Sequence, residues 1–286
     1  MSDPAVPPRP LAPVPSAGEP RTDALRRLLA ILDRLRAPDG CPWDLKQTVA
    51  TLAPSVIEEA HELVEAIESG DERGTVEETG DLLMALLLIC RVAEDEGRFS
   101  AADAALAVGD KLIRRHPHVF GEAAATDAEG VVANWERIKA AERRAKDEDA
   151  SALAGVPRAL PALQRALRLS AKAVAAGFRW PTPEGALAKV EEELSELRAA
   201  RKAGDRARVE AELGDLLMAA AFLGSYLDVD PERATRAALA RFEARFRSME
   251  AELGAGAREA SLAAWMEAWG RAKAAEQAAV RYPGVP

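Results

Sequence analysis

A pair of carboxylates at the start of an apolar helix occurs twice in this chain and constrains its fold more than any other feature. Glu78 and Asp81 directly precede Leu82–Cys90, which is apolar throughout, and Glu212 and Asp215 precede a similar run. Residues three apart share one face of a helix, and a helix that is apolar nearly all the way round is expected to be buried. A carboxylate taken out of water needs a cation, hydrogen-bond donors or a metal ion. The sequence therefore predicts acidic sites held inside helical domains.

The repetition extends beyond this pair. Glu59 and Glu78 have the same separation as Glu193 and Glu212, and other acidic, basic and aromatic positions recur with them. No segment alternates between apolar and polar residues as a strand would, so we expect an all-α protein with two tandem, four-helix-bundle-like domains. The expected organisation is a disordered Pro-rich arm (1–20), a first domain (21–145), a linker (146–158) and a second domain (159–286).

Helical periodicity and end signals predict the individual helices. Ser55 is the expected N-cap of the second helix, which is expected to end at Gly70. The expected helices span about 21–35, 55–68, 76–96, 101–115, 129–146, 160–169, 185–202, 206–227, 231–253 and 261–280.

Composition excludes several classes of protein. The formal net charge of -9 argues against a nucleic-acid duplex as partner, because phosphate backbones are bound by basic surfaces. The longest apolar run is far below the roughly 20 residues that span a bilayer. Cys41 and Cys90 are too few for a disulfide framework, and the first twenty residues lack the apolar core of a secretory signal. A cytoplasmic protein without membrane contact is the expectation.

The acidic residues fit a divalent-cation site. Two neighbouring helices would bring four carboxylates together in each domain, and ligands that are all oxygen favour Mg²⁺, with Mn²⁺ as the alternative, over zinc. Magnesium commonly completes its shell with substrate phosphates, so a polyphosphate ligand follows. A solvated acidic face, or acids that complement a helix dipole, are the structural alternatives. The four candidates are Glu59, Glu62, Glu78 and Asp81 in the first domain and Glu193, Glu196, Glu212 and Asp215 in the second.

Basic and aromatic residues complete each set. Lys111 with Arg115, and Arg241 with Arg245, are spaced four apart and could neutralise phosphates opposite a metal ion, unless they form an ordinary basic face. Trp135 and Trp269, which follow these basic pairs in the chain, could stack on a base or belong to the core.

Several motifs together make the chain similar to the MazG family of nucleoside triphosphate pyrophosphohydrolases. The resemblance implies an all-α NTP pyrophosphatase fold, a homodimer, dependence on Mg²⁺, and hydrolysis of (d)NTPs to the monophosphate and pyrophosphate. The motifs are CPWD at 41–44, EEAHE at 58–62, ETGDLL at 78–83, KLIRRHPHVF at 111–120, KVEEELSE at 189–196 and ELGDLL at 212–217.

The family's site residues transfer most completely to the second domain, which the resemblance makes the more active one. The first domain has Ser55 and Gly74 where the second has Lys189 and Arg208, so it keeps the acids and loses two cations. The implied metal ligands are the four acids of the second domain, and the implied nucleotide contacts are Lys189, Arg208, Arg241, Arg245, Trp269 and Lys273.

The expected reaction is attack of water at phosphorus, which breaks the bond between the α and β phosphates. Glu192 is the candidate for orienting that water. Two alternatives stay open. One is a sensor or scaffold that binds metal and NTP without hydrolysis, and the other is a phosphohydrolase of the same fold restricted to one substrate such as dUTP.

Overall fold

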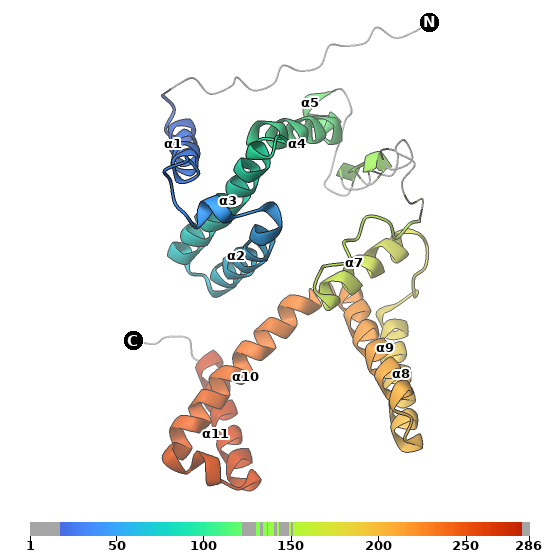
Figure 1. Ribbon diagram of the computed structural model, residues 1–286. Helices are drawn as coiled ribbons and strands as arrows, with labels where there is room; N and C mark the ends of the chain where they lie inside the picture. Colours follow the sequence, from blue (N-terminus) through green and yellow to red (C-terminus); the bar gives the residue numbers. More distant parts are fainter. Residues whose placement is uncertain are drawn as a thin grey trace, which may run out of the picture. The chain divides into compact units, whose positions relative to one another are not determined.

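The computed structural model describes residues 18–121, 130–131, 134–135, 137–139, 142, 149 and 151–281. These residues are mainly helical and include no β-strand, which confirms the all-α prediction. The chain divides into two units, Met1–Lys146 (the first unit) and Asp147–Pro286 (the second unit), coloured from blue to green and from yellow-green to red in Figure 1. The predicted arm at 1–20 lies outside the described residues up to position 17, as do both ends of the helix predicted at 129–146.

The first unit is built around a helical hairpin. Gly70 adopts a left-handed backbone with φ of 73° and ends the first hairpin helix, which lets the chain reverse within a few residues. Helix α1 packs on α3, and the buried core joins Leu32, Leu52, Leu88 and Val92. The elements are α1 (Pro20–Leu35), η1 (Asp44–Lys46), α2 (Val49–Ser69), α3 (Glu72–Asp95), α4 (Ala101–Arg115) and α5 (Pro117–Phe120), with the hairpin formed by α2 and α3.

Helix α2 begins earlier than its sequence pattern suggested. The N-cap is Thr48, whose hydroxyl accepts from the Thr51 amide while the Thr51 hydroxyl accepts from the Thr48 amide. Pro54 lies inside the helix rather than before it, so the prediction of Ser55 as N-cap was wrong. The reciprocal cap secures the first turn, and the loss of one backbone hydrogen bond at Pro54 does not end the helix.

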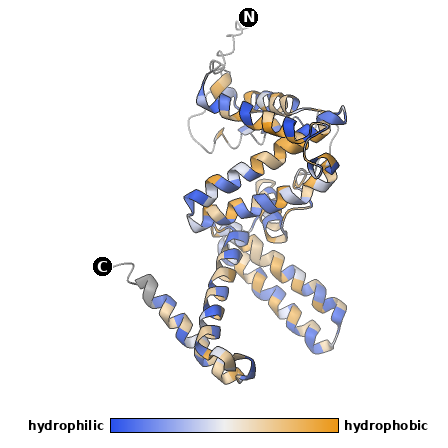
Figure 2. Ribbon diagram, turned by 60° about the vertical axis from the view of Figure 1, so that its left-hand side comes forward, coloured by the Kyte–Doolittle hydropathy of each residue, from blue (hydrophilic) through white to orange (hydrophobic). Residues whose placement is uncertain are grey.

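The second unit repeats the hairpin and adds a pair of helices. Gly204, with φ of 72°, ends α8 as Gly70 ends α2. Helix α7 packs on α9, and α10 packs on α11, while Figures 1 and 2 both show the pair α10–α11 diverging from the hairpin α8–α9. The elements are α7 (Ala162–Ala175), α8 (Pro183–Ala203), α9 (Arg206–Tyr226), α10 (Pro231–Leu253), η2 (Gly254–Glu259) and α11 (Leu262–Arg281).

The apolar runs after the acidic pairs are only partly buried. Ala85 and Leu88 are buried, but Leu86 is exposed, and so are Leu217 and Met218 in the second unit. The expectation that these helices are enclosed was wrong for the single chain, because α1 and α4 against α3, and α7 and α10 against α9, leave these side chains uncovered. No helix of the described residues combines the length and apolar character that crossing a lipid bilayer requires.

Candidate functional site

Three acidic residues of the second unit meet between α8 and α9. Carboxylate oxygens of Glu193, Glu196 and Glu212 lie within 4.8 Å of one another. Glu193 and Glu196 are separated by three residues and so share one face of α8, while the tight reversal at Gly204 returns α9 alongside and brings Glu212 to the same place. Glu193 is only 5% exposed, which is unusual for a carboxylate and indicates a partner.

Two cations lie beside these acids, on the same helices. The Lys189 Nζ is 2.7 Å from Glu193 Oε1 and 2.9 Å from Glu192 Oε1, and these hydrogen bonds raise the pKa of Lys189, so its charge is kept. The Arg208 guanidinium lies 3.3 Å from Glu212 Oε1. The acids of this cluster still repel one another. The charge of Glu212 is the largest cause that raises the pKa of Glu196, followed by burial and the charge of Glu193.

The remaining two predicted residues of this hairpin lie outside the cluster. Asp215, one turn after Glu212 on α9, is exposed and does not belong to the group of acids that meet. Glu192 is also exposed, and Lys189 engages its carboxylate. The structure thus brings together three of the four predicted ligands in this unit.

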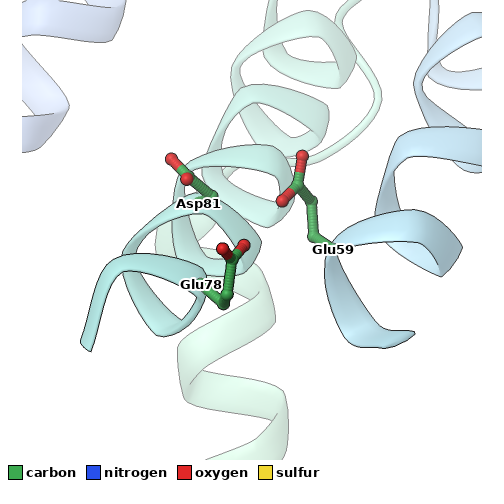
Figure 3. Close-up of side chains that lie close together, drawn as sticks. All are labelled: Glu59, Glu78 and Asp81. Atoms are coloured by element: carbon green, nitrogen blue, oxygen red, sulfur yellow. The ribbon is translucent and has the colours of Figure 1, made fainter. Parts of the chain in front are cut away.

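The first unit forms a corresponding cluster, but its three acids do not all stand at the positions that correspond to those of the second unit. Oxygens of Glu59, Glu78 and Asp81 lie within 4.8 Å of one another, and Figure 3 shows Glu59 of α2 facing the two residues of α3. Glu62 is exposed and lies outside this group. Burial is the largest cause that raises the pKa of both Glu59 and Glu78, followed by the charges of neighbouring acids that include Glu62 and Asp81.

Both clusters fit a hard divalent cation. Oxygen ligands at about 2.1 Å from an octahedral Mg²⁺ lie about 3 to 4 Å apart, so small side-chain adjustments would let either triad share one ion. Three carboxylates without sulfur or imidazole match Mg²⁺ or Mn²⁺ rather than zinc. Neutralising the repulsion among the acids is the physical gain from binding.

The predicted basic pair of the second unit lies on α10 and faces α11. Arg245 Nε donates to Glu276 Oε2 at 2.6 Å, and its guanidinium carbon lies 5.1 Å from the centre of the Trp269 ring. Arg241, Arg245 and Glu276 help to line a pocket of about 390 Å³ between the two helices. The hydrogen bond from Arg245 is the largest cause that lowers the pKa of Glu276, and the charges of Arg245, Arg241 and Lys273 lower it further.

The first unit repeats this arrangement. Glu142 accepts from Arg114 and Arg115, each at 2.6 Å, and these bonds lower the pKa of Glu142 to about 2. Lys139 Nζ lies 4.4 Å from the centre of the Trp135 ring. The predicted Lys111 lies exposed on α4, one turn before Arg115.

Sequence reasoning missed the two glutamates. Glu142 and Glu276 each stand seven residues, two helical turns, after Trp135 and Trp269. Their recurrence at the same distance in both halves was the available signal.

Comparison with known proteins places these features in one family. Residues 47–120 match the model of the MazG nucleotide pyrophosphohydrolase domain, and residues 162–241 match that of phosphoribosyl-ATP pyrophosphohydrolase. A nucleoside triphosphate pyrophosphohydrolase of Escherichia coli K12 is 43% identical over 78% of this chain and 86% of its own length. The Thermotoga maritima nucleoside triphosphate pyrophosphohydrolase/pyrophosphatase MazG is 41% identical over 78% of this chain and 84% of its own. With its two all-α units and their acidic hairpins, the chain belongs to the MazG family of nucleoside triphosphate pyrophosphohydrolases.

Proposed function

We propose that this chain hydrolyses (d)NTPs to (d)NMPs and pyrophosphate with Mg²⁺, that the second unit carries most of the activity, and that a cytoplasmic homodimer clears the nucleotide pool. The observation that carries the assignment is the meeting of Glu193, Glu196 and Glu212 beside Lys189 and Arg208. The first unit has the acids without the two cations, since Ser55 and Gly74 stand at the corresponding positions.

The residues of the hairpin α8–α9 have complementary tasks. The three acids would hold Mg²⁺, which would neutralise charge on the triphosphate and make a water molecule easier to deprotonate. Lys189 neutralises phosphate charge at the same point, and preorganised charges of this kind often give the largest part of a rate enhancement. Glu192 is exposed and accepts a hydrogen bond from Lys189, and at this position it can accept a proton from a water directed at phosphorus.

Product analysis tests the activity. The protein is incubated with Mg²⁺ and a panel of (d)NTPs, with phosphoribosyl-ATP included because of the family model that matches 162–241. We expect equal amounts of nucleoside monophosphate and pyrophosphate, and none with a chelator present. Binding of the nucleotides without any pyrophosphate would overturn the proposal in favour of the sensor or scaffold, and turnover of one substrate alone would indicate the narrow-specificity alternative.

Glu196→Gln should stabilise the metal-free protein near neutral pH. The pKa of Glu196 is raised in the folded chain, so the folded state binds the proton more tightly, and stability falls as pH rises from about 4.5 through the raised pKa. Above that window the repulsion is fully present, and the amide removes it. In thermal melts at pH 7 to 8, the variant should unfold at a higher temperature than the unaltered protein without metal, and gain less from added Mg²⁺. A lower melting temperature of the metal-free variant would contradict this.

Glu276→Gln should weaken substrate binding more than turnover. The carboxylate holds Arg245 at 2.6 Å against Trp269, and a partly exposed ion pair contributes little, so KM should rise by less than about tenfold. Glu276 is a positioning residue here, because it acts through Arg245. Steady-state kinetics should show KM raised severalfold with little change in kcat, while Glu267→Gln on the same helix, 73% exposed, should change neither. An equal loss of kcat and no change in KM would refute this role.

A further inference from the structure

Two carboxylates of the second unit form ion pairs with cations that stand one turn earlier on the same helices. Lys189 Nζ lies 2.7 Å from Glu193 Oε1 on α8, and the Arg208 guanidinium lies 3.3 Å from Glu212 Oε1 on α9. Spacing of four residues places each pair on one face of its helix. The carboxylates that a divalent cation would need are therefore the ones that an ammonium and a guanidinium bind.

In both ion pairs the cation is much more exposed than the acid. The side chains of Glu193 and Glu212 are 7% and 12% exposed, against 35% for Lys189 and 57% for Arg208. Both cations end long side chains, and both bind phosphate oxygens as readily as carboxylates. Their charged ends can therefore turn from a carboxylate to a phosphate while the acids stay in place.

The acidic triad of the first unit lacks cations at the two corresponding positions. Ser55 stands four residues before Glu59 on α2, and Gly74 stands four residues before Glu78 on α3. Neither residue carries a charge on its side chain, and Figure 3 shows Glu59 facing Glu78 and Asp81. A divalent cation would relieve the repulsion among these acids without competing with a cation at either position.

We propose that the two units take their divalent cations differently: the first unit binds the free cation, and the second binds it together with a nucleoside triphosphate. In the second unit Lys189 and Arg208, the cation pair, compete with a free cation for the carboxylates. A triphosphate offers the cation pair anionic oxygens of its own, which leaves the carboxylates to the cation that the phosphates share. By linkage, nucleotide and cation then raise each other's affinity in the second unit.

This inference rests on the proposed function for the identity of the nucleotide, and binding of Mn²⁺ tests it without turnover. Glu193→Gln leaves only the triad of the first unit intact, and Glu59→Gln leaves only that of the second. In calorimetry without nucleotide, the Glu193→Gln chain should bind Mn²⁺ about tenfold more tightly than the Glu59→Gln chain, an effect that screening by water keeps moderate. Equal affinities, or tighter binding by the second unit, would overturn the proposal.

Removal of the cation pair should abolish the difference between the units. Lys189→Met with Arg208→Met, placed in the Glu59→Gln chain, should tighten binding of free Mn²⁺ by about tenfold. Lys202→Met with Arg206→Met removes the same charge from the same two helices, at exposed positions, and should change the affinity by less than about twofold. An equal gain in this control would assign the effect to net charge and refute the role of the cation pair.

The nucleotide complex should respond in the opposite direction. A fluorescent α,β-imido-ATP carries the triphosphate charge and is not cleaved between the α and β phosphates. With saturating Mn²⁺ it should bind the chain without the cation pair about tenfold more weakly, because two phosphate contacts are lost. Tighter binding of both free Mn²⁺ and the nucleotide would overturn the proposal. Should the unaltered protein release no pyrophosphate, the proposed function fails while the affinities for free Mn²⁺ still decide the competition.

Discussion

Replacing Glu193 by glutamine should reduce pyrophosphate release by on the order of 1,000-fold, the largest effect we expect from a single substitution. Glu193 is 5% exposed, and its carboxylate lies 2.7 Å from Lys189 and belongs to the triad with Glu196 and Glu212. The amide has nearly the same shape, so the helix is retained while one negative ligand is lost. The measurement is turnover of a dNTP at saturating Mg²⁺, with circular dichroism to confirm the fold. Turnover above about a tenth of the unaltered value would exclude Glu193 as an essential ligand.

Two matched variants locate this effect. Glu191→Gln makes the same chemical change two residues earlier on α8, at an exposed position, and should leave turnover unchanged. Glu59→Gln alters the corresponding acid of the first unit, where Ser55 and Gly74 stand in place of the cations, and should lower turnover by less than about twofold. A severe loss in Glu59→Gln with none in Glu193→Gln would place catalysis in the first unit.

The fold was predictable where local signals agree with the final packing. Helices α4 and α10 begin and end where expected, because Ser100 and Asp230 cap their first turns and Pro117 and Gly254 follow their last. The start of α2 was not predictable, since a proline is a strong signal against a helix. The reciprocal cap of Thr48 with Thr51 also lacks the Glu or Gln that usually stands three residues after the N-cap.

For the site, the sequence was sufficient to predict which helices supply its residues. Spacing of three residues places acids on one face, and a hairpin with a glycine at its reversal brings two such faces together. Which acid is left outside depends on the rotation and offset of each helix, and these differ between the units: Glu62 is outside in the first and Asp215 in the second. Local periodicity contains no information on that offset. It also cannot separate an apolar residue buried in its own chain from one such as Leu217, which remains exposed here.

Lys189→Ala should lower kcat/KM by about 100-fold while it strengthens cation binding. Because these two quantities change in opposite directions, the variant distinguishes a catalytic charge from a structural one. The ammonium lies 2.7 Å from Glu193 and 2.9 Å from Glu192, so it competes with a divalent cation for the same carboxylates. Its removal should tighten binding of Mn²⁺, measured by calorimetry without nucleotide, by roughly severalfold, since a partly exposed charge is screened by water.

Reciprocal and matched variants complete this test. Ser55→Lys places an ammonium four residues before Glu59, as Lys189 stands before Glu193, and should weaken Mn²⁺ binding in the first unit. Lys202→Ala, near the end of α8, should alter neither quantity. If Lys189 only supported the helix, its loss would weaken cation binding and turnover together. Because the two units share their acids and differ in this cation, such an outcome would remove the physical reason for assigning catalysis to the second.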